Sequence, residues 1–257
     1  RAGQPVYEPL YTIDDAEGAI SHLVPVSYGT VTDVLEGVSI RFTDVGHLLG
    51  SASIEVWMKE NDVEKKMVFS GDIGNHDRPI LRNPQLTEEA DYVMIESTYG
   101  NRLHEQIVSE NDYVRQLTDC IQKTLDRGGN VVIPSFAVGR TQELLYFIRQ
   151  IKQDQLIHGH PDFKVYVDSP LANEATSVFI QSDREYFDEN MQKILDQGLN
   201  PLTFPGLEVS VSSEESKAIN FDQEPKVIIS ASGMCEAGRI RHHLKHNLWR
   251  PECYILF

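Results

Sequence analysis

The stretch Val131–Lys152 reads VVIPSFAVGRTQELLYFIRQIK and runs from a short apolar segment, through a turn, into a longer patterned one. The four uncharged residues of Val131–Pro134 are typical of a buried strand. Thr141–Lys152 places apolar side chains at helical spacing and predicts a helix. A strand that leads directly into a helix is the repeating unit of a parallel sheet covered by helices.

The same alternation of strand and helix extends from this unit in both directions. We expect strands at Tyr92–Glu96, Lys164–Val167, Leu207–Val211, Lys226–Ser230 and Cys253–Phe257. We expect helices near Asn111–Asp126, between the strand Lys164–Val167 and Asp196, after Ser212 and near Arg239–His246. On the helix near Asn111–Asp126, the apolar residues Val114, Leu117, Ile121 and Leu125 share one face. This part of the chain therefore predicts a parallel sheet with helices on both faces.

The residues before Tyr92 show a different pattern. Short runs rich in β-branched residues, separated by turn residues, predict an antiparallel meander, and these runs are Val31–Leu35, Val38–Phe42, Ser53–Met58 and Lys66–Phe69. Thr12–Leu23 predicts a short helix before them, with Ala16, Ile20 and Leu23 on its apolar face. No linker separates the two patterns, which suggests that one domain is inserted into the other, with the join near Ser97–Arg102.

Charge limits how the chain can bind nucleic acid. The 257 residues carry a formal net charge of −16, which argues against broad electrostatic binding, so a polynucleotide has to be held locally. The segment Arg239–Arg250, RIRHHLKHNLWR, offers such a grip because it has four positive charges, three histidines and no acid. A solvated helix face with a basic end explains the same segment equally well.

Cysteine usage and hydropathy indicate the compartment. Cys120, Cys235 and Cys253 lie far apart without a CxxC pair, so we expect buried small side chains rather than disulfides or a cysteine zinc site. No apolar run approaches the ~20 residues that a membrane-spanning helix needs, and the first residues lack the apolar core of a signal peptide. We therefore expect a cytoplasmic protein without membrane contact.

Two glycine-rich turns carry candidate metal ligands. GHLLGSA, residues 46–52, places His47 in a turn between two strands, and FSGDIG, residues 69–74, places Asp72 directly after a strand. Imidazole nitrogen and carboxylate oxygen are both good zinc donors. Taken singly, each residue has a plainer explanation: His47 could form a local hydrogen bond, and Asp72 could be part of an ordinary Gly-Asp turn. Together they favour a metal site.

These turns belong to an ordered series of motifs. GHLLGSA and FSGDIG are followed by IESTYGNR at 95–102, PSFAVGRTQELL at 134–145, VYVDSPLA at 165–172 and ISASGMCEAGRIRHHL at 229–244. The series resembles the motifs of β-CASP metallo-β-lactamase nucleases. That family includes the endonuclease subunit of the eukaryotic pre-mRNA 3′-end cleavage factor, its bacterial and archaeal relatives and, more distantly, ribonuclease J. The resemblance covers nearly the whole chain.

The resemblance implies an α/β fold: part of a metallo-β-lactamase αββα sandwich with an inserted β-CASP domain, a parallel sheet flanked by helices. It places a partial metallo-β-lactamase domain at residues 1–98, the β-CASP domain at 99–252 and the start of a strand that returns to the first domain at 253–257. An inserted domain of that size suits a polymeric substrate, which argues against a small ester or amide.

The resemblance also assigns roles in a metal site. His47 would bind one zinc ion, Asp72 would bridge two, and Glu96 would orient a catalytic histidine supplied by a later motif. Zinc is thus the implied cofactor, with two ions in each intact active site. Without the resemblance, Glu96 is a strand-end carboxylate that caps Ser97-Thr98.

RNA contacts are expected where strands end, because free backbone amides at a helix start favour a phosphate. The candidates are Ser135 and Arg140 in one strand-to-helix turn, Ser232 after another strand, Arg102, which we favour over His104, and Arg239, Arg241, His242 and His243 in the basic segment. Each turn by itself is common and is usually only structural. Arg102 has the alternative of an ordinary surface residue.

The main metal motif of the family, HxHxDH, has one false match here. His158-Gly159-His160-Pro161-Asp162 spells its first five positions, but Phe163 stands in place of the last histidine, so we reject it. Neither a true HxHxDH nor the later histidine segments of the family, SGHAD-like and HGE-like, occur in the chain. We therefore expect this chain to be an inactive fragment of the intact enzyme.

Two functions follow from these observations. The intact protein is expected to be a zinc-dependent RNA phosphodiester hydrolase, an endoribonuclease or a 5′ exonuclease. The alternative is a non-catalytic RNA-binding or scaffolding module that uses the basic segment and the cleft. RNA is the expected partner in both, and the sequence leaves formation of a homodimer open.

Overall fold

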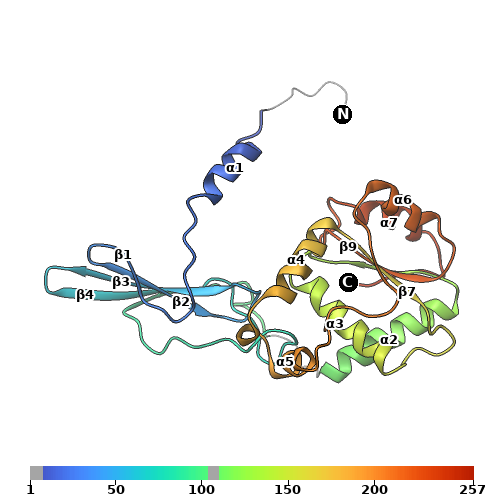
Figure 1. Ribbon diagram of the computed structural model, residues 1–257, viewed down its shortest axis with the longest axis horizontal. Helices are drawn as coiled ribbons and strands as arrows, with labels where there is room; N and C mark the ends of the chain where they lie inside the picture. The colour runs from blue at the N-terminus through green and yellow to red at the C-terminus, as the bar shows by residue number, and fades with distance from the viewer. Residues whose placement is uncertain (1–7, 104–109) are drawn as a thin grey trace.

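The computed structural model describes residues 8–103 and 110–257 and contains two five-stranded sheets. The first sheet extends to one side of the molecule, and the second, with helices on both faces, forms the bulk on the other side (Figure 1). No helix in the described residues is long and apolar enough to cross a membrane. The two patterns in the sequence thus correspond to two separate sheets in an α/β fold.

The first sheet has the strand order β1-β2-β3-β4-β5. Its strands span Thr32–Leu35 (β1), Val38–Asp44 (β2), Ala52–Glu60 (β3), Val63–Phe69 (β4) and Tyr92–Met94 (β5). Strands β1 to β4 pair in antiparallel fashion, which confirms the predicted meander, and β5 runs parallel to β4. The turn between β2 and β3 carries His47, and the segment after β4 carries Asp72.

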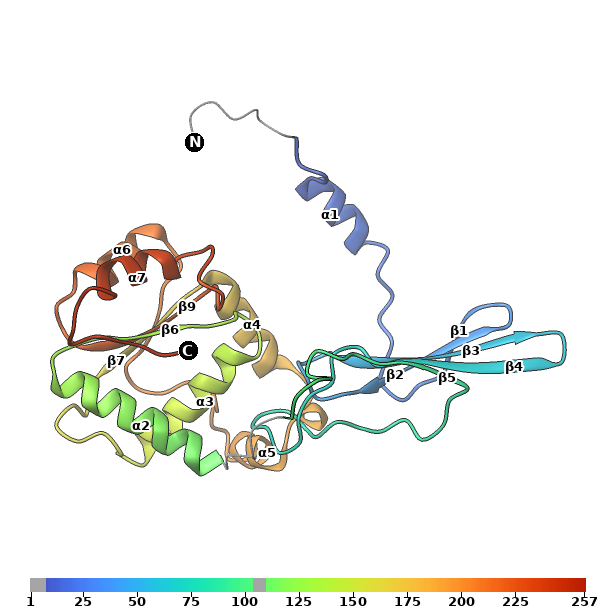
Figure 2. The ribbon, with the colours of Figure 1, turned by 180° about the vertical axis from the view of Figure 1, so that it is seen from behind.

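Helix α1, Ile13–Ile20, stands away from both sheets (Figures 1 and 2). A capping box begins it: the Thr12 hydroxyl accepts from the Asp15 amide at 3.3 Å, and the Asp15 carboxylate accepts from the Thr12 amide at 2.8 Å. The helix is thus fixed by local signals. None of its residues is buried, so the apolar face that includes Ile20 finds no partner in the described part of the chain.

The second sheet is parallel throughout and has the strand order β10-β6-β9-β7-β8. Its strands span Val131–Pro134 (β6), Lys164–Asp168 (β7), Leu207–Val209 (β8), Lys226–Ser230 (β9) and Tyr254–Ile255 (β10). Its helices span Glu110–Asp126 (α2), Arg140–Gln153 (α3), Pro170–Gln181 (α4), Glu189–Asp196 (α5), Ser213–Phe221 (α6) and Ile240–Asn247 (α7), with a 3-10 turn at Arg184–Tyr186. These elements confirm the predicted parallel sheet.

Alternate residues of β6 enter two different cores. Val131 and Ile133 pack in the large cluster to which α2 and α3 contribute. Val132 points to the opposite face, where it packs with Ile219 of α6 and Ile240 of α7. Figure 2 shows α2 and α3 on one side of the sheet and α6 and α7 on the other. Both faces need apolar side chains, which is why this strand reads as an unbroken apolar run.

The last strand differs from the expectation. We expected residues 253–257 to begin a strand returning to the first domain, but β10 pairs with β6 and extends the second sheet. Gly129 accounts for this, because a Cβ there would lie 1.9 Å from the carbonyl oxygen of Glu252. The chain passes directly over this glycine, and Tyr254 then donates its amide to the Asn130 carbonyl at 2.9 Å. The predicted domain boundary near residue 98 stays a prediction.

A short clamp joins the two halves of the molecule. The Ile80 amide donates to the Asp188 carboxylate at 2.9 Å, and the Asp188 amide donates back to the Ile80 carbonyl at 2.9 Å. The side chain of Ile80 is 1% exposed and belongs to the core of the second sheet. Arg82 adds a bond from its guanidinium to the Glu185 carbonyl at 3.2 Å. The segment after the first sheet is thereby fixed against the second.

A buried carboxylate ties together three strands of the first sheet. Glu55 on β3 is fully buried; Arg41 of β2 binds it through two nitrogens at 2.8 Å, the Thr43 hydroxyl donates to it at 2.7 Å, and Lys66 of β4 lies 2.5 Å away. Burial alone would raise the pKa of Glu55. The hydrogen bonds from Arg41, Lys66 and Thr43 outweigh burial and hold the pKa at about 2.

We expect Glu55→Gln to lower the free energy of unfolding by about 3 kcal/mol, because the half-buried Arg41 and Lys66 lose the buried carboxylate that pairs with both. Urea unfolding at neutral pH measures this loss. Lys65→Gln is the matched control, since the Lys65–Asp91 ion pair at 2.6 Å lies at the surface and its loss should change stability by less than about 1 kcal/mol. Equal losses in the two variants would contradict the importance of the buried cluster.

Candidate functional site

The turn between β2 and β3 holds His47 in a fixed, exposed position. Asp44 shapes this turn, since its carboxylate accepts from the Gly46 amide at 2.8 Å and from Arg82 Nε at 2.7 Å. Gly46 has φ +59°, and a Cβ there would lie 2.7 Å from the Arg82 carbonyl oxygen. The Ser51 hydroxyl accepts from the His47 amide at 3.1 Å. The backbone is thus held at several points while the imidazole stays exposed.

The segment after β4 brings Asp72 to the same place. The Gly74 amide donates to the Val45 carbonyl at 2.8 Å, and a Cβ on Gly74 would lie 2.1 Å from the Gly46 carbonyl oxygen. Only glycine at position 74 allows the two turns to touch backbone to backbone. The structure therefore places the two predicted metal ligands, His47 and Asp72, on adjoining turns.

Glu96 lies just beyond β5 and binds the Asp72 turn. One carboxylate oxygen accepts from the Ile73 amide at 2.7 Å, and the other accepts from the Thr98 hydroxyl at 2.8 Å. These two bonds, with the Ile73 amide first, lower the pKa of Glu96, and the nearby His47 contributes in the same direction. The carboxylate is therefore ionised and already engaged, partly as the cap on Thr98 that the sequence allowed.

The three side chains line a cleft of about 960 Å³ between the two halves of the molecule. His47, Asp72 and Glu96 come from the first half, and the turn Phe136–Arg140 and Leu171 come from the second. The halves meet closely here, since a Cβ on Gly139 would lie 2.4 Å from the Leu48 side chain. The cleft thus combines the candidate metal ligands with the strand-to-helix turn that was predicted to face RNA.

The residues predicted to contact RNA have different environments. Arg140 is exposed at the rim of the cleft, where it pairs with Glu143 at 2.7 Å, and Arg102 is exposed with its guanidinium 4.1 Å from the ring centroid of Tyr99. His104 lies outside the described residues. Ser232 is half-buried and donates to the Ala237 carbonyl at 3.4 Å.

Ser135 departs from the expectation. Its side chain is 1% exposed, donates to the Phe136 carbonyl at 3.2 Å and accepts from the Thr141 hydroxyl at 3.0 Å. A buried hydroxyl that is already bonded in this way has no free face for a phosphate. The side chain of Ser135 therefore secures the turn, and the neighbouring Phe136, 56% exposed and missed in the sequence, faces the cleft instead.

The basic segment is divided between the core and the surface. His243 is fully buried, with Nε2 2.6 Å from Asp168 and Nδ1 2.9 Å from Asn220. Arg239 donates to Asp168 at 2.7 Å and to the Val211 carbonyl at 2.6 Å. The prediction that His243 contacts RNA is therefore wrong, and the hydrogen-bonding capacity of Arg239 is largely used inside the protein. Arg241 and His242 are exposed.

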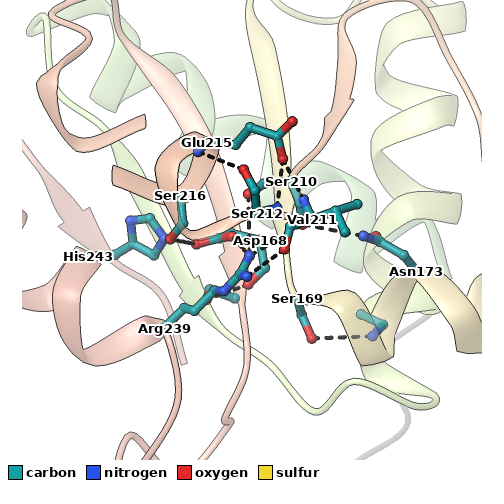
Figure 3. A network of polar contacts seen from close by, with 12 residues as sticks. Asp168, Ser169, Asn173, Ser210, Val211, Ser212, Glu215, Ser216, Arg239 and His243 are labelled. Carbon is teal, nitrogen blue, oxygen red and sulfur yellow. Dashed lines mark hydrogen bonds and ion pairs between the residues drawn. The ribbon is translucent and has the colours of Figure 1, made fainter. Parts of the chain in front are cut away.

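Asp168 is the centre of this buried network, shown in Figure 3. Its carboxylate lies at the end of β7 and receives, in addition to Arg239 and His243, the hydroxyl of Ser216 at 2.6 Å. Burial would raise the pKa of Asp168, but hydrogen bonds from His243, Ser216, Arg239 and Ser210 outweigh burial and hold the pKa at about 2. The network joins β7 to α6 and to the start of α7.

Comparison with known proteins agrees with this architecture. The Beta-Casp domain model matches residues 141–257. Ribonuclease TTHA0252 of Thermus thermophilus is 40% identical over 252 residues, which are 97% of this chain and 55% of that protein. Residues 141–257 of this chain are a β-CASP domain.

Other relatives of this β-CASP chain carry different names. Transcription termination factor FttA of Lokiarchaeum sp. is 32% identical over 236 residues, 91% of this chain and 36% of that protein. An RNase J-like protein of Methanocaldococcus jannaschii is 30% identical over 236 residues, 91% of this chain and 52% of that protein. The chain thus spans about half the length, or less, of the curated relatives that it matches.

The side chains suit zinc but are too few to hold it. A zinc site takes three or four protein donors, and in the described residues no group of three His, Cys, Asp or Glu side chains is placed to hold a metal ion. His47 and Asp72 are donors of the right chemistry on adjoining turns, whereas both oxygens of Glu96 accept other hydrogen bonds. Two donors are present where a complete site needs more.

In the sequence, Asp168 appears only as one residue of the motif VYVDSPLA. An aspartate at the end of the apolar run KVYVD signals that a polar partner is needed. That signal does not identify the partners, because Arg239 and His243 lie 71 and 75 positions further along the chain. In this β-CASP fold, Asp168 meets Arg239 and His243 only after α7 packs on the sheet.

We expect Asp168→Asn to lower the free energy of unfolding by about 3 kcal/mol at neutral pH, because the half-buried Arg239 loses its counter-charge. A depressed carboxyl pKa stabilises the fold fully above its ordinary value of 3.8, and this contribution is lost as the pH falls towards about 2. In urea unfolding, the gap between the native protein and the variant should therefore shrink between pH 4 and pH 2. A gap that stayed constant across this range would contradict the role of the ionised carboxylate.

Proposed function

We propose that the intact protein hydrolyses RNA phosphodiester bonds in the cleft, with zinc as its cofactor and endonucleolytic cleavage as its main activity. One observation carries the proposal: His47, Asp72 and Glu96 from the first half of the molecule face the exposed turn Phe136–Arg140 of the second across a single cleft. The names of two relatives, a ribonuclease and an RNase J-like protein, support RNA as the substrate.

In this proposal, His47 and Asp72 are two of the zinc donors, and further donors come from outside the described residues. Bound zinc supplies Lewis acidity and lowers the pKa of water, the chemistry that metal-dependent phosphodiester hydrolysis needs. Asp72 is exposed, and no side-chain hydrogen bond restrains its carboxylate in the described part of the chain, so it is free to coordinate metal. Its position depends on the backbone contact between Gly74 and Gly46.

Glu96 serves this site as a positioning residue. Its bond to the Ile73 amide at 2.7 Å fixes the residue next to Asp72, so the carboxylate controls where the donor turn lies. The family resemblance adds an imidazole that Glu96 would orient, supplied from outside the described residues. Glu96 stays ionised across the neutral range because these hydrogen bonds lower its pKa.

The opposite wall of the cleft receives the RNA strand. Arg140 is exposed at its rim and sits at the start of α3, where the partial positive charge of the helix N-terminus favours a phosphate. Phe136 offers an exposed ring for a base to stack on. A strand bound here has its backbone near Arg140 and faces the turns that carry His47 and Asp72.

We expect Asp72→Ala to reduce cleavage of single-stranded RNA by the full-length protein, with zinc present, by more than about 100-fold. Initial rates on a labelled oligonucleotide measure the effect. Asp62→Ala, an exposed aspartate in the turn between β3 and β4, is the control and should cleave at the native rate. Undiminished cleavage by the Asp72 variant would eliminate its role as a metal ligand.

We expect Arg140→Gln to weaken binding of single-stranded RNA and to reduce the slope of log affinity against log salt concentration by about 0.7, the loss of one phosphate contact. Fluorescence anisotropy across a salt series measures the slope. Arg115→Gln is a matched control, because Arg115 is exposed on α2 and pairs with Asp112 three residues away, as Arg140 pairs with Glu143. A slope unchanged in the Arg140 variant would place the RNA backbone elsewhere.

A non-catalytic RNA-binding module is the second candidate. It is favoured because no group of three metal-ligating side chains occurs among the described residues. The same assays separate the two functions. RNA binding that depends on Arg140, without cleavage by the native full-length protein at any zinc concentration, would support the module and exclude the hydrolase. Cleavage that disappears with Asp72→Ala would exclude the module.

A further inference from the structure

A second cavity of about 1250 Å³ lies at the opposite end of the second sheet. Its walls are the end of α3, the connection from residue 154 to the first residue of β7, and the loop before β8. The RNA cleft borders the turns that follow β6 and β7, whereas this cavity borders Lys164, where β7 begins. The two hollows share no lining residue and therefore do not belong to one site.

The cavity gathers positive charge in a strongly acidic chain. Arg149, Lys152 and Lys164 line it, together with His158 and His160, and one aspartate, Asp162, is the single acid among its lining residues. The chain as a whole has a formal net charge of −16. In the described residues, Arg149 and Lys152 form no ion pair with a carboxylate, although Asp162 lies near enough to Lys152 to raise its pKa, and Lys164 acts on Asp222. Cations without an ion-pair partner at one concave place favour an anionic ligand.

Lys152 is the best placed of these cations. It is half-buried, donates to the carbonyl oxygen of Phe163 and has its ammonium 3.7 Å from the centroid of the Phe163 ring. Position 206 is a glycine, and a Cβ there would lie 3.2 Å from Nζ, so the loop before β8 packs closely against the ammonium. An ammonium has three donors, and burial lowers the pKa of Lys152 more than the nearby Asp162 raises it.

The wall of the cavity formed by residues 158–162 is held in place from α2. Gln122 donates to the His158 carbonyl at 2.9 Å and accepts from the His158 amide at 2.7 Å, and His160 Nε2 lies 3.0 Å from the Asp126 carboxylate. This is the segment whose HxHxD spelling imitates a metal motif. It forms no three-donor metal group in the described chain, and its structural effect is to close one side of the cavity.

We propose that this cavity binds a small phosphate-bearing ligand of the nucleotide class. Arg149 and Lys152 would hold its phosphate, because charge-assisted hydrogen bonds to phosphate are the strongest that these side chains make. The apolar part of the lining, which includes Pro161, Leu199 and Phe204, suits the base and sugar. The cavity, at about 1250 Å³, is large enough to take a ligand of this size.

Isothermal titration calorimetry of the full-length protein with AMP tests the proposal, with adenosine and inorganic phosphate as separate probes. We expect saturable binding of AMP that weakens as salt is added, and at least tenfold weaker binding of adenosine. Lys152→Met should weaken AMP binding about tenfold or more, the loss of one charge-assisted bond. Lys123→Met is the control, because Lys123 is an exposed lysine on α2 that does not line the cavity, and it should bind AMP as the native protein does.

Two variants keep the result specific. Arg140→Gln, in the RNA cleft, should leave AMP binding unchanged if the ligand occupies the second cavity, and urea unfolding of Lys152→Met should confirm that the variant is folded. Three results would overturn the proposal: no AMP binding at millimolar concentration, equal affinity for adenosine and AMP, or native affinity in Lys152→Met. If single-stranded RNA displaced AMP, and its binding also depended on Lys152, the cavity would belong to the path of the RNA strand. That result would also overturn the proposal.

Discussion

The exchange of hydrogen bonds between Ile80 and Asp188 determines how the two halves of the molecule face each other. Asp188 also begins α5, because its carboxylate accepts from the Met191 amide at 2.6 Å, so one side chain both starts a helix and binds the segment after the first sheet. Burial raises the pKa of this carboxyl, and its bonds to backbone amides act against that rise. The cleft exists because this contact brings the turns of His47 and Asp72 opposite the end of β6.

Electrostatics is organised locally in this chain. Two buried carboxylates draw polar groups inward: Glu55 in the first sheet binds Arg41, Lys66 and the Thr43 hydroxyl, and Asp168 in the second binds Arg239, His243 and the Ser216 hydroxyl. Both carboxyls have a pKa of about 2. Other positive charges line the two hollows: Arg140 lies at the cleft, and Lys152 and its neighbours lie at the second cavity. An acidic protein can in this way hold anions at defined places without binding polyanions over its whole surface.

The sequence predicted the elements better than the contacts. Val131–Pro134 and Lys226–Ser230 have the bounds that were expected, because a strand covered on both faces reads as an apolar run whatever its neighbours are. Arg239 and His243 were assigned to RNA because their charges are adjacent in the chain, yet their partner Asp168 lies on another strand. The strand pattern had included Cys253–Phe257 in the parallel sheet, whereas the resemblance directed these residues to the first domain; β10 pairs with β6, and that pairing depends on the bare backbone of Gly129.

The contact between Gly46 and Gly74 has a consequence for whatever binds between His47 and Asp72. The two turns touch without a side chain between them, so neither can shift unless the other follows. Their relative order is established when the chain folds, and a ligand bridging the two residues does not have to arrest two independent loops. The entropy cost of ordering His47 and Asp72 is part of folding and not of ligand binding, so more of the binding energy contributes to affinity.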